Sequence, residues 1–155
     1  MKKRNRQPDP ERLGIGIVEI TNLRASGPAP HKVTATLTLQ RPWPGGISQN
    51  RNGDLIVTQP INIGFEISDT TDYSFAGGPK FAGKGNANNG DKGDHDMPEK
   101  DYILKTVRSI QITNYWENHG GSHEYRWKYT LPLWCADGKL GNIDPDIEND
   151  ETKRK

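Results

Sequence analysis

The sequence has little cysteine: Cys135 is the single one in 155 residues. An internal disulfide is therefore excluded, and the hydrophobic core must hold the fold, as a chain of this length allows. No stretch approaches the 18 apolar residues that a membrane-spanning helix needs, and the basic start over residues 1–6 is followed by no apolar run of the kind found in a signal peptide. These absences predict a cytoplasmic protein with no membrane span.

The sequence also lacks an excess of charge of either sign. Its 21 basic and 20 acidic residues leave a formal net charge of +1, which gives no long-range field to steer a polyanion. Both ends of the chain are locally basic, but the acidic stretch 144–151 would oppose a phosphate backbone. The charge pattern therefore argues against a nucleic-acid partner.

Catalytic motifs and helical periodicity are missing as well. The sequence contains no nucleophile elbow, phosphate-binding loop or paired Cys-His signature, so we expect no enzymatic activity. The nearest candidate for a helix is Pro98–Leu104, one or two turns at most.

Strict alternation of apolar and polar residues is the clearest positive signal. It runs from Glu124 to Cys135 and predicts a half-buried strand, because successive side chains of a strand point to opposite faces. The polar face includes Trp134, and the inward face consists of Tyr125, Trp127, Tyr129, Leu131, Leu133 and Cys135.

Shorter β-branched segments predict further strands, separated by turns rich in Gly, Pro, Asn and Asp. We expect Pro60 to split one of them into two short strands or to mark an edge strand. The turn at 118–122 is expected to join the segment 107–115 to the strand after it as a hairpin. The remaining predicted strands fall within 13–23, 33–39, 55–57, 61–67 and 136–149.

Together these segments predict an all-β fold: an antiparallel β-sandwich, or a partly open barrel, of five to seven strands. The domain is expected to span residues 13–149. The basic segment 1–12 and the segment 150–155 contain too few apolar residues to hold themselves in place, so we expect them to be disordered tails.

One long insertion, residues 69–101, interrupts this pattern. It is rich in Gly, Asn and Asp, and fixing each backbone residue costs about 1–2 kcal/mol, which its few large apolar side chains cannot offset. We therefore expect it to be mobile, at least over 83–96, unless an ion, a partner or a second subunit holds it. A plain solvated spacer is the simplest interpretation.

Aromatic residues in exposed settings suggest a binding function. Tyr73, Phe75 and Phe81 are candidate anchors within the insertion, and Trp43, Trp116 and Trp134 lie at loop edges or on the polar strand face. The leading hypothesis is a non-catalytic module that uses these residues to dock onto a protein partner or onto copies of itself. The alternative is a lectin-like module in which a tryptophan stacks on a sugar ring.

Two sets of residues are candidate metal ligands, although no cofactor is otherwise expected. Asp91, Asp94 and Asp96 offer the oxygen ligands that calcium prefers, without the spacing of an EF-hand. His119 and His123 flank a glycine turn and could contribute to a zinc site, but structural zinc usually needs four ligands.

Overall fold

The computed structural model describes residues 9–84, 102–116, 124–144 and 146–150. A short 3₁₀ turn, η1 (Pro10–Arg12), precedes the strands. In chain order these are β1 (Ile15–Ser26), β2 (His31–Leu39), β3 (Ile47–Gln49), β4 (Leu55–Val57), β5 (Ile61–Ile67), β6 (Ser74–Phe75), β7 (Lys80–Lys84), β8 (Tyr102–Thr106), β9 (Ser109–Asn114), β10 (Glu124–Trp134), β11 (Leu140–Ile143) and β12 (Asp146–Asp150).

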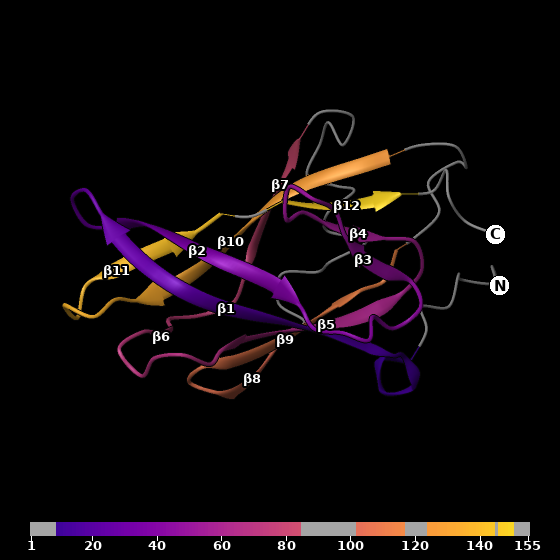
Figure 1. Cartoon of the computed structure of the whole chain (residues 1–155), viewed down its shortest axis with the longest axis horizontal. Helices are drawn as coiled ribbons and strands as arrows, with labels where there is room; N and C mark the ends of the chain where they lie inside the picture. Colours follow the sequence, from indigo (N-terminus) through magenta and orange to yellow (C-terminus); the bar gives the residue numbers. More distant parts are fainter. Residues whose placement is uncertain (1–8, 85–101, 117–123, 145, 151–155) are drawn as a thin grey trace, which may run out of the picture.

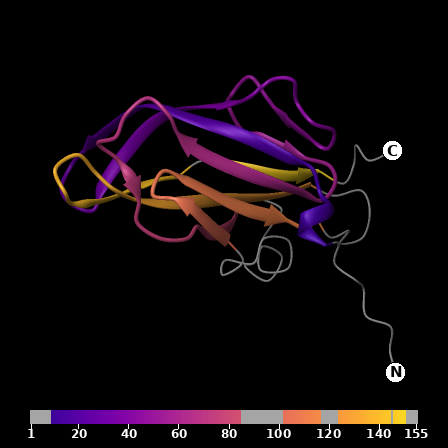
Figure 2. The same ribbon diagram turned by 90° about the horizontal axis from the view of Figure 1, so that it is seen from below.

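The all-β class is confirmed, but the strand number was underestimated. The strands pair in the order β3-β4-β12-β10-β11-β2-β1-β5-β9-β8, and β6 and β7 each pair with β10. Eight of them form one sheet that curls into a half-barrel around the core (Figures 1 and 2). The sequence underestimates the number because strands of two or three residues, such as β3 and β6, are too short to show alternation.

The strand pairing is mixed rather than purely antiparallel. Three pairs of strands are parallel: β1 with β5 and β11 with β2 in the eight-stranded sheet, and β12 with β4 in the rest of the path. Each joins strands that are distant in the sequence, as a parallel pair requires. Local turns predict only the antiparallel neighbours, so these long-range pairs were not visible in the sequence.

The predicted hairpin across residues 118–122 is wrong, because β9 and β10 do not pair with each other. β9 has one neighbour on each side, β5 and β8, so neither of its edges is open to β10. β10 instead pairs with β11, β12, β6 and β7. The prediction relied on β9 and β10 being close in the sequence, but they cannot pair because β5 and β8 occupy both edges of β9.

The insertion is partly built into the sheet, contrary to its interpretation as one long loop. β6 and β7 both lie within it and pair with β10, and the buried Phe75 belongs to the core. The Phe75 N–H also donates to the Val107 carbonyl at 2.7 Å, which ties β6 to the turn between β8 and β9. Most of the segment 83–96 lies outside the described residues, so its expected mobility stays a prediction. Residues 1–8 and 151–155 of the predicted tails also lie outside the described residues.

The core lies between the curled layers and contains Tyr129, Leu131, Leu133 and Cys135 of the predicted inward face. The side chains of Tyr125 and Trp127 lie outside the described part of the structure. Tyr129 is 1% exposed, and its ring lies 5.3 Å from the ring of Phe65. The buried apolar side chains are Val18, Ile20, Val33, Leu39, Ile47, Leu55, Val57, Ile61, Ile63, Phe65, Ile67, Phe75, Ile110, Ile112, Tyr115, Tyr129, Leu131, Leu133, Cys135, Ile143 and Ile147.

Candidate binding surface

The clearest feature of the surface is a group of exposed apolar side chains on one short strand. In β8, Tyr102 is 37% exposed, Ile103 is 56% exposed and Leu104 is 45% exposed. Val107, in the turn that follows, is 54% exposed. Single exposed apolar residues are ordinary, but neighbouring ones typically mark an interaction site.

β8 is also the last strand of the sheet path. Among the described strands it pairs with β9 alone, and Figure 1 shows it at the margin of the fold beside β9. The backbone on its other side therefore offers N–H and C=O groups that no described strand uses. Such an edge is a template for another extended segment.

Both faces of β8 carry apolar side chains. Leu104 lies opposite the buried Ile110 and so points to the core side, whereas Ile103 lies opposite the half-buried Gln111 and points outward. Strands with two apolar faces usually lie inside a sheet, where both faces are covered. β8 thus has the side chains of an interior strand at an edge position.

Two features limit how far this edge can pair. The register of β8 against β9 shifts between Leu104 and Thr106, and the residue at that point is the exposed Lys105. Bulges and lysines are the devices by which proteins prevent uncontrolled edge-to-edge association. The regular part of the free edge is therefore short, Tyr102–Leu104.

An open groove of about 570 Å³ runs beside β8 on the face of the sheet turned away from the core. Its polar floor includes Asn62, which is 5% exposed, and Thr113, whose hydroxyl donates to Asn62 Oδ1 at 2.6 Å. The lining residues are Pro10, Glu11, Leu13, Ile15, Asn62, Tyr102, Ile103, Lys105, Gln111, Thr113 and Tyr115.

η1 forms one wall of this groove, and Asn62 holds it there. The Asn62 side-chain amide donates to the Pro10 carbonyl at 2.8 Å, and its backbone N–H donates to the Gly14 carbonyl at 2.9 Å. The exposed side chains of Glu11 and Lys105 supply opposite charges in the lining. With apolar Ile15 and Ile103 in the lining as well, the groove suits a ligand with both polar and apolar groups, such as a peptide.

The aromatic residues proposed from the sequence lie in different settings. Phe75 is 4% exposed, because β6 carries its side chain into the core, so it is not part of the open surface. Tyr73 is half-buried and packs against the core. Phe81 lies in β7, and its side chain lies outside the described part of the structure.

The three tryptophans also differ. Trp134 is 46% exposed, as its place on the polar face of β10 predicts. Trp43 is half-buried: its indole N–H donates to the Leu39 carbonyl at 3.1 Å, and the Arg41 guanidinium lies 4.2 Å from its ring centroid. Trp116 is half-buried and packs against the core. The structure thus leaves Trp134 as the most open of the three.

The proposed metal ligands Asp91, Asp94, Asp96, His119 and His123 lie outside the described residues, so both metal hypotheses stay predictions. Within residues 9–84, 102–116, 124–144 and 146–150, no group of three or more His, Cys, Asp or Glu side chains is arranged to hold a metal ion.

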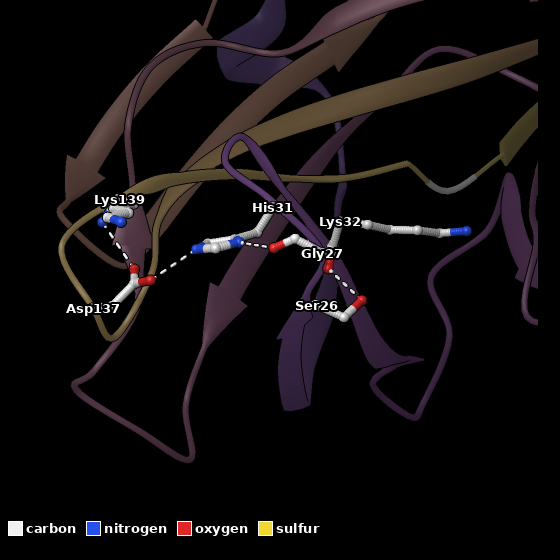
Figure 3. Close-up of polar contacts among 6 residues, drawn as sticks. All are labelled: Ser26, Gly27, His31, Lys32, Asp137 and Lys139. Carbon is white, nitrogen blue, oxygen red and sulfur yellow. Dashed lines mark hydrogen bonds and ion pairs between the residues drawn. The ribbon is translucent and has the colours of Figure 1, made fainter.

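A second polar cluster joins His31, at the start of β2, to Asp137, in the turn between β10 and β11 (Figure 3). His31 Nε2 lies 2.8 Å from Asp137 Oδ2, and its Nδ1 lies 2.8 Å from the Gly27 carbonyl oxygen. Ionised carboxylates and carbonyls only accept hydrogen bonds, so both ring nitrogens must donate. While both contacts are hydrogen bonds, the ring is an imidazolium without a lone pair, and in that form it cannot act as a general base.

Cys135 lies in the same region of the fold and is 4% exposed. Burial raises the pKa of its thiol, and the nearby Asp137 carboxylate raises it further. Because the thiolate is the reactive form, this cysteine behaves as a core residue rather than a nucleophile.

We found no family model that matches this sequence and no curated protein that resembles it. Within the described part of the chain, no helix is long and apolar enough to cross a bilayer. The function must therefore be inferred from the surface itself.

The sequence prediction missed the β8 surface. Residues 98–104 were the nearest helical candidate, yet 102–106 form a strand, and 98–101 lie outside the described residues. The signal that could have found it is the apolar run Tyr102-Ile103-Leu104, in which the first two residues favour strands.

Proposed function

We propose that this protein is a non-catalytic interaction module that binds an extended segment of a partner protein along the free edge of β8. The observation that carries the proposal is the exposure of Tyr102, Ile103 and Leu104 on a strand that pairs on one side only among the described strands. The bound segment would add to the sheet as a further strand.

An extended segment is favoured over a helix because of the backbone at this edge. Unpaired N–H and C=O groups are satisfied by a parallel or antiparallel strand, whose main chain supplies affinity and whose alternate side chains supply specificity. One set of those side chains would lie on the outer face, where the groove and Ile103 provide apolar contact next to the amide of Gln111.

This proposal keeps the hypothesis of a protein partner, but it assigns the binding surface to β8 instead of to the aromatic residues of the insertion. The insertion ends where β8 begins, so the docking surface follows the insertion rather than using Phe75 within it. The short regular edge and the lysine at its end favour a partner of different sequence over a second copy of this chain.

Selection of extended peptides from a displayed library on the purified protein tests the proposal. Selected peptides should carry apolar or β-branched residues at alternate positions and should shift the amide resonances of β8 and β9. Ile103→Lys should weaken their binding at least tenfold, about 1.4 kcal/mol. Leu140→Lys is the matched control, because Leu140 is 43% exposed but lies in β11, which is separated from β8 by four strands of the sheet path, and it should leave affinity within about twofold.

The proposal is refuted if the peptides bind equally well to the Ile103→Lys variant or if their resonance shifts lie away from β8 and β9. Light scattering on the free protein would show whether β8 instead joins two copies of the chain. A dimer that Ile103→Lys dissociates would assign the edge to self-association.

A carbohydrate-binding function is the second candidate, and the exposed indole of Trp134 favours it. An aromatic face open to water can stack on a sugar ring. A glycan array probed with the wild-type protein and with Trp134→Ala separates the two functions. Glycan binding that disappears in Trp134→Ala but persists in Ile103→Lys would support the sugar site, and a blank array would reject it.

A further inference from the structure

The two halves of the sheet path meet at a short parallel pairing between β2 and β11. Only two residue pairs form it, Gly141 with His31 and Asn142 with Lys32. On one side lie β3, β4, β12, β10 and β11, and on the other lie β2, β1, β5, β9 and β8. We call this pairing the seam.

A polar bridge spans the seam at His31. The ring connects the carbonyl of Gly27, in the turn between β1 and β2, to the carboxylate of Asp137, in the turn between β10 and β11 (Figure 3). Both turns are set locally. Gly27 has a φ of +73°, in the left-handed region that favours glycine, and Asp137 Oδ1 accepts the Lys139 backbone N–H at 2.9 Å.

The bridge can be complete only while the ring carries two protons. A neutral imidazole has one N–H and one lone pair, and here each nitrogen faces an oxygen acceptor at 2.8 Å. Flipping the ring by half a turn does not restore the second hydrogen bond, because both partners are acceptors. Loss of the proton therefore breaks one of the two contacts and sets a lone pair against an oxygen.

We propose that His31 is a proton-dependent latch that holds the seam between β2 and β11 closed while its ring is an imidazolium and loosens it when the ring becomes neutral. The His31 side chain is 14% exposed, so it stays within reach of solvent protons. The latch acts at the seam and is independent of the proposed binding at β8.

The charged groups around the ring determine the direction of its response. The hydrogen bond to Asp137 raises the pKa of His31 most and the Gly27 carbonyl raises it further, whereas partial desolvation of the ring and, to a smaller extent, the positive charge of Lys139 lower it. Lys32, next to it on β2, extends away from the ring in Figure 3. For Asp137, the hydrogen bond from the Lys139 backbone N–H lowers the pKa of the carboxyl most, and the hydrogen bond with His31 lowers it further.

These shifts define the pH range in which the latch is closed. Because the folded-state pKa of His31 is raised, its contribution to stability is complete below about pH 6.5 and is lost as pH rises through the raised pKa. Because the pKa of Asp137 is lowered, its contribution is present above about pH 4 and is lost as pH falls through the lowered pKa. The latch is therefore closed in mildly acidic solution and loosens as pH rises through the raised pKa of His31.

A titration of the intact protein by ¹⁵N NMR of the histidine rings tests the latch. We expect both ring nitrogens of His31 to carry protons at pH 6 and its midpoint to lie above 6.5. Asp137→Asn should lower that midpoint, because the hydrogen bond to the Asp137 carboxylate raises the pKa of His31 most. Asp72→Asn, an exposed carboxylate on the loop after β5, is the matched control and should leave the midpoint unchanged.

A stability comparison provides a second test. Glutamine at position 31 offers one donor group and one acceptor, so it resembles the neutral ring. The melting temperature of the wild type should exceed that of His31→Gln at pH 6, and the difference should shrink at pH 9. A His31 midpoint at or below 6.5 in the wild type, an unchanged midpoint in Asp137→Asn, or a constant difference in melting temperature would overturn the proposal. If His31→Gln does not fold, the titrations of the wild type and Asp137→Asn decide it.

Discussion

Replacing Gly141 by alanine should destabilise the protein through overpacking at the seam. A Cβ at this position would lie 2.6 Å from Cys135 Sγ, 2.9 Å from Val33 Cγ2 and 3.1 Å from the His31 carbonyl oxygen. The first two distances are shorter than real carbon contacts allow. β11 can therefore approach β2 this closely only because residue 141 has no side chain.

The structure also limits how far the neighbours can move. Cys135 and Val33 are both 4% exposed, so neither side chain can turn out into solvent without leaving the core, and the His31 oxygen belongs to the backbone of the seam itself. Overpacking of a well-filled core costs about 1–3 kcal/mol. In a domain of this size each kcal/mol shifts the melting temperature by about 2–4 °C, which gives a fall of about 2–12 °C.

Urea unfolding followed by tryptophan fluorescence measures this cost directly. Gly45→Ala is the matched control, since Gly45 is exposed and a Cβ there meets nothing within 4 Å. That variant should stay within about 0.5 kcal/mol of the wild type. A double-mutant cycle with Cys135→Ala, which removes the nearest obstructing atom, should show that the two substitutions together cost less than their sum.

An unchanged unfolding free energy in Gly141→Ala would refute this reasoning, because it would mean that β11 and β2 are not held as close as the structure has them. Strict additivity in the double-mutant cycle would show that Cys135 is not the obstructing neighbour.

Three further substitutions or treatments test the core, the groove and the buried thiol. Phe65→Ala removes the ring that contacts Tyr129 and should cost about 3–5 kcal/mol in urea unfolding, and a cost below 1 kcal/mol would contradict the assigned core. Asn62→Ala leaves the Thr113 hydroxyl without its acceptor and should cost about 1–3 kcal/mol by the same assay. Cys135 should not react with an aromatic disulfide reagent at pH 7 until urea unfolds the chain, and rapid labelling of the native protein would contradict its burial.

Local sequence patterns predicted several elements correctly. β10 follows the alternation seen in the sequence, with Tyr129, Leu131 and Leu133 buried and Trp134 exposed. Pro60 separates β4 from β5, as predicted. Each of these depends on side-chain periodicity or turn chemistry over a few residues, which is information that a short stretch of sequence carries.

The candidate sites were harder to predict because exposure depends on which strands become neighbours. Phe75 and Ile103 are both large and apolar in the sequence, yet one is 4% exposed and the other 56%. The difference arises because β6 pairs with β10, whereas β8 stays at the edge beside β9. Nothing within the insertion or immediately after it distinguishes the two residues.

The sequence by itself determined the all-β class, the alternation of β10 and the absence of internal disulfides, because periodicity, turn residues and cysteine number are local or compositional properties. Only the tertiary structure decided the three parallel pairs, the contact between His31 and Asp137 and the edge position of β8. These depend on residues far apart in the chain, such as the 106 positions that separate His31 from Asp137. Such contacts form when strands with similar local patterns choose among several partners, and burial of the whole core makes that choice.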